Sequence, residues 1–338
     1  MRLPIYTFLL PFVISSACAE TSQSNNPELS KSNPSLLDTT LTAPANQDDI
    51  HQFEHVNLYS ISSSSNGVYY IEFIPLSEAL QSGEEPEDLA LPPYLMSDAH
   101  EIDPDTLFYL ENEYRNSVLE FAGIDETDSV YVFDLAKNHI ESFPVSAFRI
   151  VAFINPYGAD LPYRKTDYIF GLDVTKRSEK GDRTYNRQEF ASIEEFNPFI
   201  EGSAIRIEWN EINEADYPAE LTIDWPEYSP TKCYSFAFED YMYFARIYRK
   251  GQAEYGIKID IRRGGQFIWS RTDYSSEGSD PILPMLYNND NFSHWTGRWF
   301  RNKPPVLFNV YVVSFGCPAV YYIHEQGNVQ SLICDNRH

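Results

Sequence analysis

YMYFARIYRKGQAEYGIKIDIRRGGQFIWSRTD, residues 241–273, is the stretch of this 338-residue chain that decides the fold. It contains three runs rich in β-branched and aromatic residues: 241–249, 253–262 and 266–273. Lys250-Gly251 separates the first two runs, and Arg263-Gly264-Gly265 separates the last two. Short connections that contain glycine join antiparallel strands in hairpins. We therefore predict three consecutive antiparallel strands here.

Apolar and polar residues alternate within this stretch and in two shorter ones. Along 257–262 the pattern is Ile257, Ile259 and Ile261 against Lys258, Asp260 and Arg262. The segments 205–210 and 221–225 repeat it with Ile, Leu and Trp on one side. A period of two with one polar side is typical of a strand whose polar face lies in water. We expect the polar face of this sheet to be solvated.

The whole chain is predicted to be α+β, mainly antiparallel β in sandwich or meander sheets, with one amphipathic helix packed on a sheet. The helix is expected over 104–122, because Asp103 can cap it, Pro104 suits its first turn and Gly123 suits its end. Its apolar stripe consists of Leu107, Leu110, Tyr114, Val118 and Phe121.

Other segments carry weaker signals. The strand-like runs 56–61 and 68–74 flank Asn66-Gly67, a strong turn signal, and predict a hairpin. The segment 189–196 is expected to be a short helix. The apolar segments 306–315 and 319–323 are interrupted by Asn309, Gly316 and Pro318, which favours two buried strands over a membrane span.

The N-terminus has the features of an export signal. Arg2 is followed by an apolar run from Leu3 to Ile14 and then by small residues, so residues 1–19 are predicted to be a signal peptide. Cleavage after Ala19 would release a soluble protein. The stretch Ser15-Ser16-Ala17-Cys18 resembles a relaxed bacterial lipobox, which makes Cys18 a candidate lipidation site. Residues 20–50 are polar and are predicted to be a flexible tether.

Beyond the tether, two regions are expected. Residues 51–158 form a β-rich region with the helix, and residues 159–338 form an antiparallel β region that could be continuous with it. The net charge of −25 argues against nucleic acid as a partner, because such binding requires Lys and Arg to neutralise phosphates. Contact with a membrane is expected only through a lipid on Cys18.

Three cysteines remain after residue 50. An odd number outside the cytoplasm predicts one disulfide and one free thiol. We favour the pair Cys317–Cys334, which flanks an expected hairpin, although Cys233 could take either partner.

No sequence motif for a nucleotide, metal or catalytic site is present, and no cofactor or metal is expected. The weak catalytic candidates are Glu208 and Asp224 on the polar sheet face, since glycoside hydrolysis uses two carboxyl groups at a fixed separation. The commoner alternative is a solvated face with cross-strand ion pairs.

The candidate binding residues form an aromatic and basic group: Trp295, Arg298, Trp299 and Arg301. Exposed Trp rings can stack on sugars, and Trp and Arg anchor protein interfaces. The alternative is an aromatic loop that seals the edge of the core.

Together these features favour an exported, non-enzymatic envelope protein that binds a protein or another partner through β-sheet edges and aromatic loops. The expected location is the periplasm or the outer membrane as a lipoprotein, with secretion as a further route. The second hypothesis is a carbohydrate-binding or glycoside-hydrolysing extracytoplasmic protein.

Overall fold

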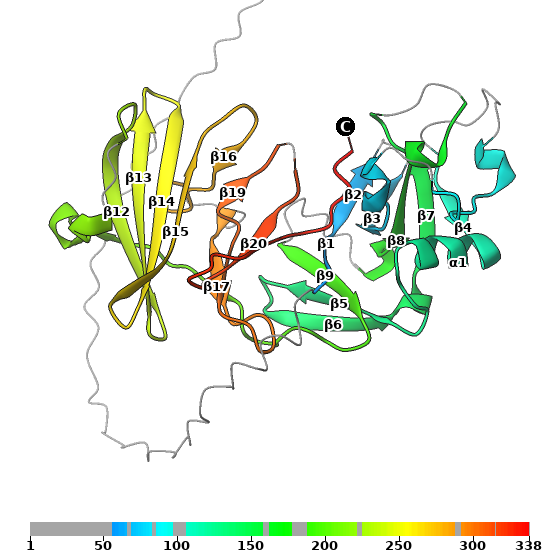
Figure 1. Cartoon of the computed structure of the whole chain (residues 1–338), viewed down its shortest axis with the longest axis horizontal. Helices are drawn as coiled ribbons and strands as arrows, with labels where there is room; N and C mark the ends of the chain where they lie inside the picture. The colour runs from blue at the N-terminus through cyan, green and yellow to red at the C-terminus, as the bar shows by residue number, and fades with distance from the viewer. Residues whose placement is uncertain are drawn as a thin grey trace, which may run out of the picture. The chain divides into compact units, whose positions relative to one another are not determined.

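The computed structural model describes residues 56–65, 69–82, 86–96, 106–157, 162–177, 188–221, 225–287, 292–314 and 316–337. These residues form mostly antiparallel sheets with one α-helix, which confirms the predicted β-rich class (Figure 1). The predicted signal peptide, the tether, Cys18 and Asp224 lie outside the described residues.

The stretch quoted above lies in a sheet whose strands follow one another in sequence. The order is β11 (Asn210–Ile212), β12 (Ser229–Phe238), β13 (Tyr241–Lys250), β14 (Glu254–Arg263) and β15 (Gln266–Tyr274). Gly251, Gly264 and Gly265 have φ of 62°, 56° and 84° in the two connecting turns, a region that glycine adopts without steric cost. We call this sheet the β11–β15 sheet.

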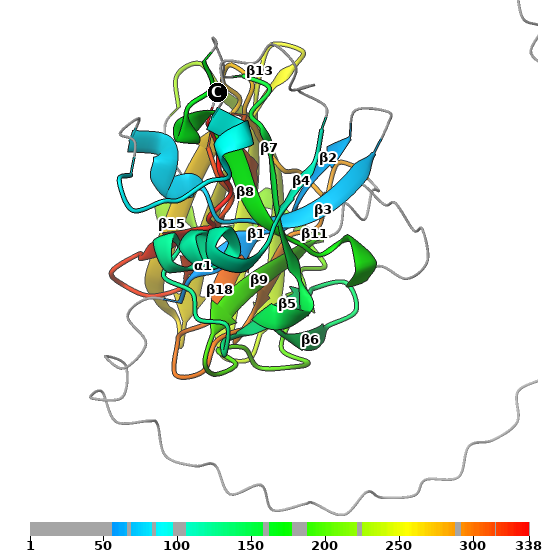
Figure 2. The same cartoon turned by 90° about the vertical axis from the view of Figure 1, so that its right-hand side faces the viewer.

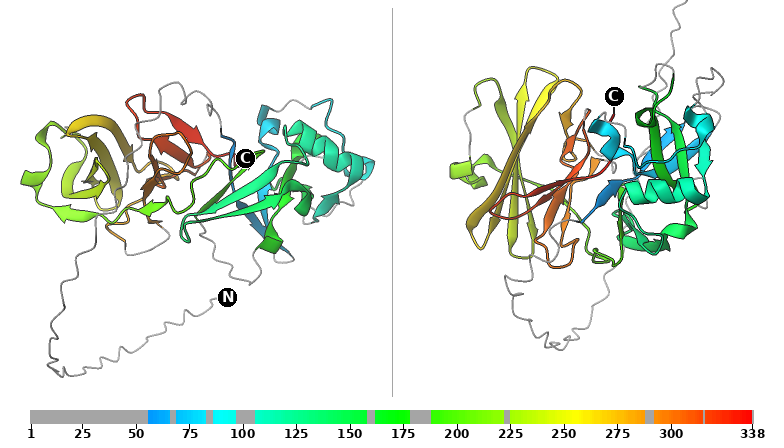
Figure 3. Two further views of the ribbon diagram at one scale, coloured as in Figure 1. Left: turned by 90° about the horizontal axis from the view of Figure 1, so that it is seen from below. Right: turned by 45° about the vertical axis from the view of Figure 1, so that its right-hand side comes forward.

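The inner face of the β11–β15 sheet is apolar and packs on a second sheet (Figure 3). Tyr243, Ile247 and Ile259 are fully buried there against Leu307 and Val310. The second sheet has the order β10 (Ile205–Arg206), β17 (Trp295–Gly297), β18 (Val306–Phe308), β20 (Ala319–Tyr322) and β21 (Val329–Ser331). The pair β16 (Asp280–Pro281) and β19 (Tyr311–Val312) is a separate small ladder.

The outer face of the β11–β15 sheet is not solvated in its centre, so that expectation was wrong. Lys258 is only 7% exposed and Asp260 is fully buried. The chain between β11 and β12 folds back over them, with two 3₁₀ turns, η7 (Glu214–Asp216) and η8 (Ala219–Leu221). We call residues 213–221 and 225–228 the covering segment. The predicted strand 221–225 is absent where the structure describes it, because Leu221 ends η8 and Trp225 begins a turn.

Two further sheets hold the N-terminal half. One has the order β1 (Leu58–Ser60), β9 (Glu189–Glu194), β5 (Ser129–Asp134) and β6 (His139–Pro144). The other has the order β2 (Ser62–Ser65), β3 (Tyr70–Pro75), β8 (Tyr168–Asp173), β7 (Arg149–Ile154) and β4 (Phe108–Leu110). Short 3₁₀ turns connect them: η2 (Glu78–Ser82), η3 (Pro93–Met96), η4 (Val145–Ala147), η5 (Lys165–Asp167) and η6 (Thr175–Arg177).

The helix α1 (Asn112–Phe121) is shorter than predicted. It lies beside the two N-terminal sheets (Figure 2). Val118 and Leu119 pack into the core that both of these sheets share. The residues 108–110, expected in the helix, instead form β4 and pair with β7. Two adjacent aromatic residues, Phe108 and Tyr109, suit an edge strand, and this pairing outweighs the weak helical stripe.

Two other expectations needed correction. Residues 189–194 form β9, which pairs with both β1 and β5, rather than a helix. Its burial on both faces suits a central strand, and Phe190 and Ile193 favour that conformation. The strand that pairs with β3 is the serine run 62–65, whereas 58–60 joins the other sheet.

A single aromatic cluster joins sheets from the two halves of the chain. Phe133 and Phe190, from β5 and β9, contact Trp299 at ring centroid distances of 6.0 Å and 5.5 Å. Phe199, Phe300 and Phe308 also belong to this cluster. Aromatic pairs of this kind contribute about 0.5–1.5 kcal/mol each beyond their burial.

The C-terminal residues return to the first strand. Cys317 and Cys334 form a disulfide with a Cα–Cα distance of 5.6 Å, the pairing that the sequence favoured. Next to it, the Ile333 amide donates to the Leu58 carbonyl over 2.7 Å, and Ser60 returns a bond to the Ile333 carbonyl. The disulfide therefore fixes a tail that pairs with β1.

Candidate functional site

The covering segment is held by polar contacts that reach through it to the sheet. The Tyr217 hydroxyl donates to Asp260 Oδ2 over 3.0 Å, and Lys258 Nζ donates to the Leu221 carbonyl over 2.8 Å. Burial raises the pKa of Tyr217, and the nearby Asp260 carboxylate raises it further. Tyr217 therefore stays a neutral hydrogen-bond donor at physiological pH.

Beneath these contacts lies a buried ion pair. Lys258 Nζ is 2.6 Å from Asp260 Oδ2, and the two residues point to the same side because they are two apart on a strand. Ser270 on β15 donates to Asp260 Oδ1 over 2.7 Å. The carboxylate thus accepts bonds from three side chains, which offsets the cost of removing it from water.

Two arginines of the sheet form ion pairs with glutamates of the covering segment: Arg246 with Glu214, and Arg262 with Glu220. The Arg246 guanidinium also lies over the Tyr217 ring, 5.2 Å from its centroid. At the other end of the segment, the Trp225 ring packs so closely on Gly256 that an added Cβ would lie 2.7 Å from it.

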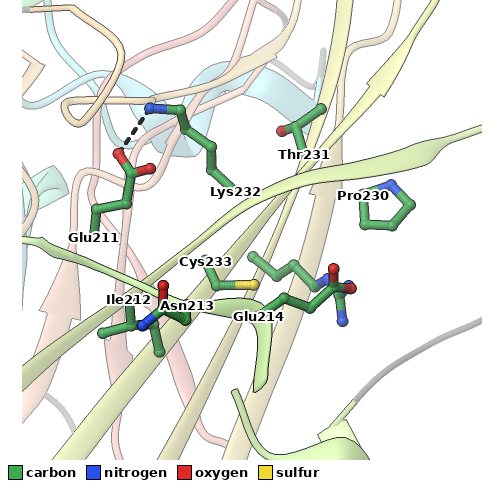
Figure 4. A pocket seen from close by; sticks show the side chains of 9 residues that line it. Glu211, Ile212, Asn213, Glu214, Pro230, Thr231, Lys232 and Cys233 are labelled. Carbon is green, nitrogen blue, oxygen red and sulfur yellow. Dashed lines mark hydrogen bonds and ion pairs between the residues drawn. The ribbon is translucent and has the colours of Figure 1, made fainter. Parts of the chain in front are cut away.

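A pocket of about 250 Å³ opens between this segment and the edge of the sheet. Its lining includes Glu211, Glu214, Thr231, Lys232, Cys233 and Arg246. Figure 4 shows the Glu211 carboxylate facing the Lys232 ammonium, 2.7 Å away, and the Cys233 sulfur inside the pocket. The pocket therefore combines a buried cation with two carboxylates.

Cys233 is the free cysteine of the described residues, and it is buried. Burial raises the pKa of its thiol, and although Arg246 opposes this effect, the pKa remains raised. A thiol is a poor nucleophile because the thiolate is the reactive form. This cysteine does not have the environment of a catalytic nucleophile.

The last strand, β15, is covered by the covering segment only in part: Ser270 donates to the buried Asp260, and the Tyr274 ring lies 5.9 Å from that of Trp225. Its side chains on the outer face are exposed, with Phe267 at 51% and Tyr274 at 53%, and Ser270 and Thr272 between them. In the described residues no strand pairs with the free edge of β15. At the end of this edge the Tyr311 hydroxyl already donates to the Tyr274 carbonyl over 3.3 Å, so the part of β15 available to a partner is the stretch from Phe267 to Thr272.

The predicted carboxylate pair is not assembled by the residues that the structure describes. The Glu208 side chain is 76% exposed and lies 3.2 Å from Arg206 as a surface ion pair. Its proposed partner Asp224 lies outside the described residues. For Glu208, the alternative of a solvated ion pair fits the structure better than a cleft.

The predicted binding group is divided between core and surface. Trp299 is fully buried and Trp295 is 7% exposed, so neither ring is available to stack on a sugar. Their indole groups donate inward, Trp299 to the Thr296 carbonyl and Trp295 to Gln188. This is the alternative interpretation, in which the loop seals the core.

The two arginines of that group stabilise loops. Arg298 pairs with Glu239 over 2.9 Å, and Arg301 Nε donates to the Asn197 carbonyl over 3.2 Å. Neither interaction brings them next to the pocket that Arg246 lines. The structure therefore relocates the candidate site from 295–301 to the outer side of the β11–β15 sheet.

Sequence reasoning missed Arg246, Tyr217 and Phe267 as site residues. Arg246 lies inside the predicted strand 241–249, where an alternating pattern places it on the outer face opposite Ile247. That signal was present in the sequence. No signal indicated that the covering segment would bury it.

Where residues are described, no group of three or more His, Cys, Asp and Glu side chains is arranged to hold a metal ion. None of the helical segments in these ranges has the length and apolar composition of a membrane span. Comparisons with protein families, curated proteins and solved structures found nothing that matches this chain.

Proposed function

We propose that this chain is a non-catalytic binding protein of the cell envelope, and that an extended partner adds along the outer edge of β15. The observation that supports this proposal is the nine-residue strand β15, whose outer face carries two half-exposed aromatic rings. Backbone groups on such an edge can hydrogen-bond to a strand from another chain.

The spacing along β15 suits an extended ligand. Phe267 and Tyr274 lie opposite Arg262 and Gly256, six strand positions apart because of a bulge between them, which corresponds to about 20 Å along a strand. Ser270 and Thr272, which lie between them on the same face, provide small polar groups. A peptide strand would gain main-chain bonds from the edge and side-chain contacts from the two rings.

The expected location rests on separate features. A disulfide such as Cys317–Cys334 is typical of proteins outside the reducing cytoplasm. The leader over residues 1–19, with Cys18 as a candidate lipidation site, supports export. An envelope location would expose β15 to proteins and glycans of the envelope.

Photo-crosslinking in native cells tests the proposed function. A photoreactive phenylalanine analogue replaces Phe267 in one variant and the exposed Phe196 in a matched control, which lies outside the β11–β15 sheet. We expect one protein to crosslink at position 267 and not at 196. Equal crosslinking at both positions, or none at 267, would overturn the proposal.

A glycan partner is the other outcome that this surface allows, since exposed Phe and Tyr rings can also stack on sugars. If position 267 crosslinks to envelope polysaccharide instead of protein, the second hypothesis of carbohydrate binding replaces strand addition. Phe267→Asp should then reduce binding to that polysaccharide, while Phe196→Asp should leave it unchanged.

A further inference from the structure

The geometry points to the pocket beside Arg246 as a binding site for a carboxylate group, in which the ligand takes the place of Glu214. This site is formed by β11, β12 and β13 and is separate from the β15 edge. Its test can therefore fail without affecting the proposed function, and the reverse is also true.

The first step of the argument is the asymmetry of the Arg246–Glu214 pair. The Arg246 side chain is 5% exposed, whereas that of Glu214 is 76% exposed. The guanidinium is thus part of the pocket wall, while its carboxylate partner reaches it from solvent. The Glu214 side chain can therefore swing into water without exposing buried apolar surface, whereas the buried Arg246 side chain cannot.

The second step concerns what would replace Glu214. A guanidinium binds carboxylates in a planar, two-pronged arrangement, and the present partner is itself a carboxylate. A monoanionic carboxylate would restore the pairing one for one while Glu214 moves into water. A dianion such as phosphate would meet the Glu211 carboxylate, which also lines the pocket.

The third step is the size and character of the pocket. Its volume of about 250 Å³ suits a small organic acid or the last residues of a peptide. Ile212 and Pro230 supply apolar lining, while Thr231 donates to the Ile247 carbonyl and Lys232 pairs with Glu211, so Arg246 is the cation left for the ligand once Glu214 moves away. The Arg246 cation at the wall would fix the carboxylate end of such a ligand.

The two sources of a carboxylate are distinguished by the probes. Butyrate, a monoanion, represents a free acid, and the tripeptide Gly-Gly-Leu represents a peptide C-terminus. The same tripeptide with an amidated C-terminus is the control for the charge. Binding to the full chain is followed by NMR titration, and pocket occupancy is followed by the shifts of the backbone amides of Thr231, Cys233 and Arg246, which line the pocket.

We expect the acid or the free tripeptide to bind and to shift these amide resonances, and the amidated tripeptide to do neither. Binding of butyrate alone assigns a free acid, and binding of the free tripeptide alone assigns a peptide end. If neither probe binds or shifts these resonances in the unmodified protein, the inference is wrong.

Two variants and one control identify the mechanism. Glu214→Gln removes the competing charge and should tighten binding by about tenfold, if Glu214 occupies Arg246 about nine-tenths of the time. Arg246→Lys keeps the charge but loses the planar fork and should weaken binding by about tenfold. Glu220→Gln removes the matching ion pair with Arg262, outside the pocket, and should leave binding unchanged. Equal effects of Glu214→Gln and Glu220→Gln would overturn the inference.

Discussion

Lys258 and Asp260, two residues apart on β14, form an ion pair beneath the covering segment, with Nζ 2.6 Å from Oδ2. The pair contacts Tyr217, Leu221 and Ser270, so it joins the segment to two strands. The desolvation of a buried ion pair offsets much of the attraction between its two charges. The intact pair therefore adds little net stability, but removal of one partner leaves a buried unpaired charge and is strongly destabilising.

Asp260→Ala should lower the free energy of unfolding by about 3–5 kcal/mol, because it leaves Lys258 buried without its counterion. The double variant Lys258→Met/Asp260→Leu should recover part of this loss, because it removes the unpaired charge but leaves the Tyr217 hydroxyl and the Leu221 carbonyl without their partners. Chemical denaturation measures both. Glu211→Ala breaks the exposed pair with Lys232 and should change stability by about 0–1 kcal/mol. An Asp260→Ala effect as small as that of Glu211→Ala would contradict the role of the pair.

His294 should make folding sensitive to acid. Its Nδ1 accepts from Trp209 and its Nε2 faces the Ile282 carbonyl at 2.8 Å, which requires the neutral ring. Burial lowers the pKa of His294 to about 4, from 6.5 in the unfolded chain. The unfolded state therefore binds the proton more readily, and stability falls as pH decreases from about 6.5 to about 4.

The loss attributable to His294 over that pH range should reach about 3 kcal/mol. The free energy of unfolding of the wild type and of His294→Gln is measured by denaturation at pH 4, 5, 6 and 7. The Asp and Glu side chains titrate in both proteins, so the difference between the two pH dependences is the contribution of His294. Gln can preserve both hydrogen bonds but does not titrate. An identical pH dependence in the two proteins would show that His294 is not the titrating group.

Loss of the Cys317–Cys334 disulfide should destabilise the chain and free its C-terminal tail. The bridge joins residues with a sequence separation of 17, and removing it should lower the free energy of unfolding by about 3 kcal/mol. Replacing both cysteines by alanine should also speed hydrogen exchange at the Ile333 amide, which bonds to Leu58. Unchanged exchange at Ile333 would mean that the tail is held without the disulfide.

Trp299 should behave as a core residue and not as a ligand-binding one. Trp299→Ala should lower the free energy of unfolding by about 3–5 kcal/mol, because it leaves a cavity between Phe133 and Phe190. Trp299→Phe should cost less, since it keeps an aromatic ring in the cluster. Thermal denaturation ranks the three proteins. If Trp299→Ala were as stable as the wild type but bound a ligand differently, Trp299 would be a ligand-binding residue and not a core residue.

The strands over 241–273 could be predicted because their alternation and glycine turns are local. The covering segment could not be predicted, because its position depends on tertiary contacts of Tyr217 and Leu221 with the sheet. The sequence indicated only that one face of this sheet is polar. The polar alternation at Lys258 and Asp260 was detected correctly, but alternation cannot distinguish water from a polar cover.

Phe267 illustrates a second limit. It is two residues before Trp269, so a regular strand would place both rings on the inner face. The register shifts at this point, with Ile261 opposite Trp269 and Arg262 opposite Phe267, so Ile268 is a bulge. The bulge turns Phe267 to the outer face, and a bulge of this kind has no distinct sequence signal here.

The candidate site at Trp295 and Trp299 was predicted from residue type alone. Residue type does not report burial, and large rings are buried more often than exposed. The helix 104–122 was placed too early for a related reason, because its first apolar residues also fit the edge strand β4.

The most direct test of strand addition is hydrogen exchange of the full chain with and without the protein recovered by crosslinking at position 267. We expect residues 266–274 of β15 to exchange more slowly in the complex, while the central strand β13, residues 241–250, stays unchanged. Protection confined to other parts of the chain, with β15 unaffected, would contradict the proposal that partners bind along this edge.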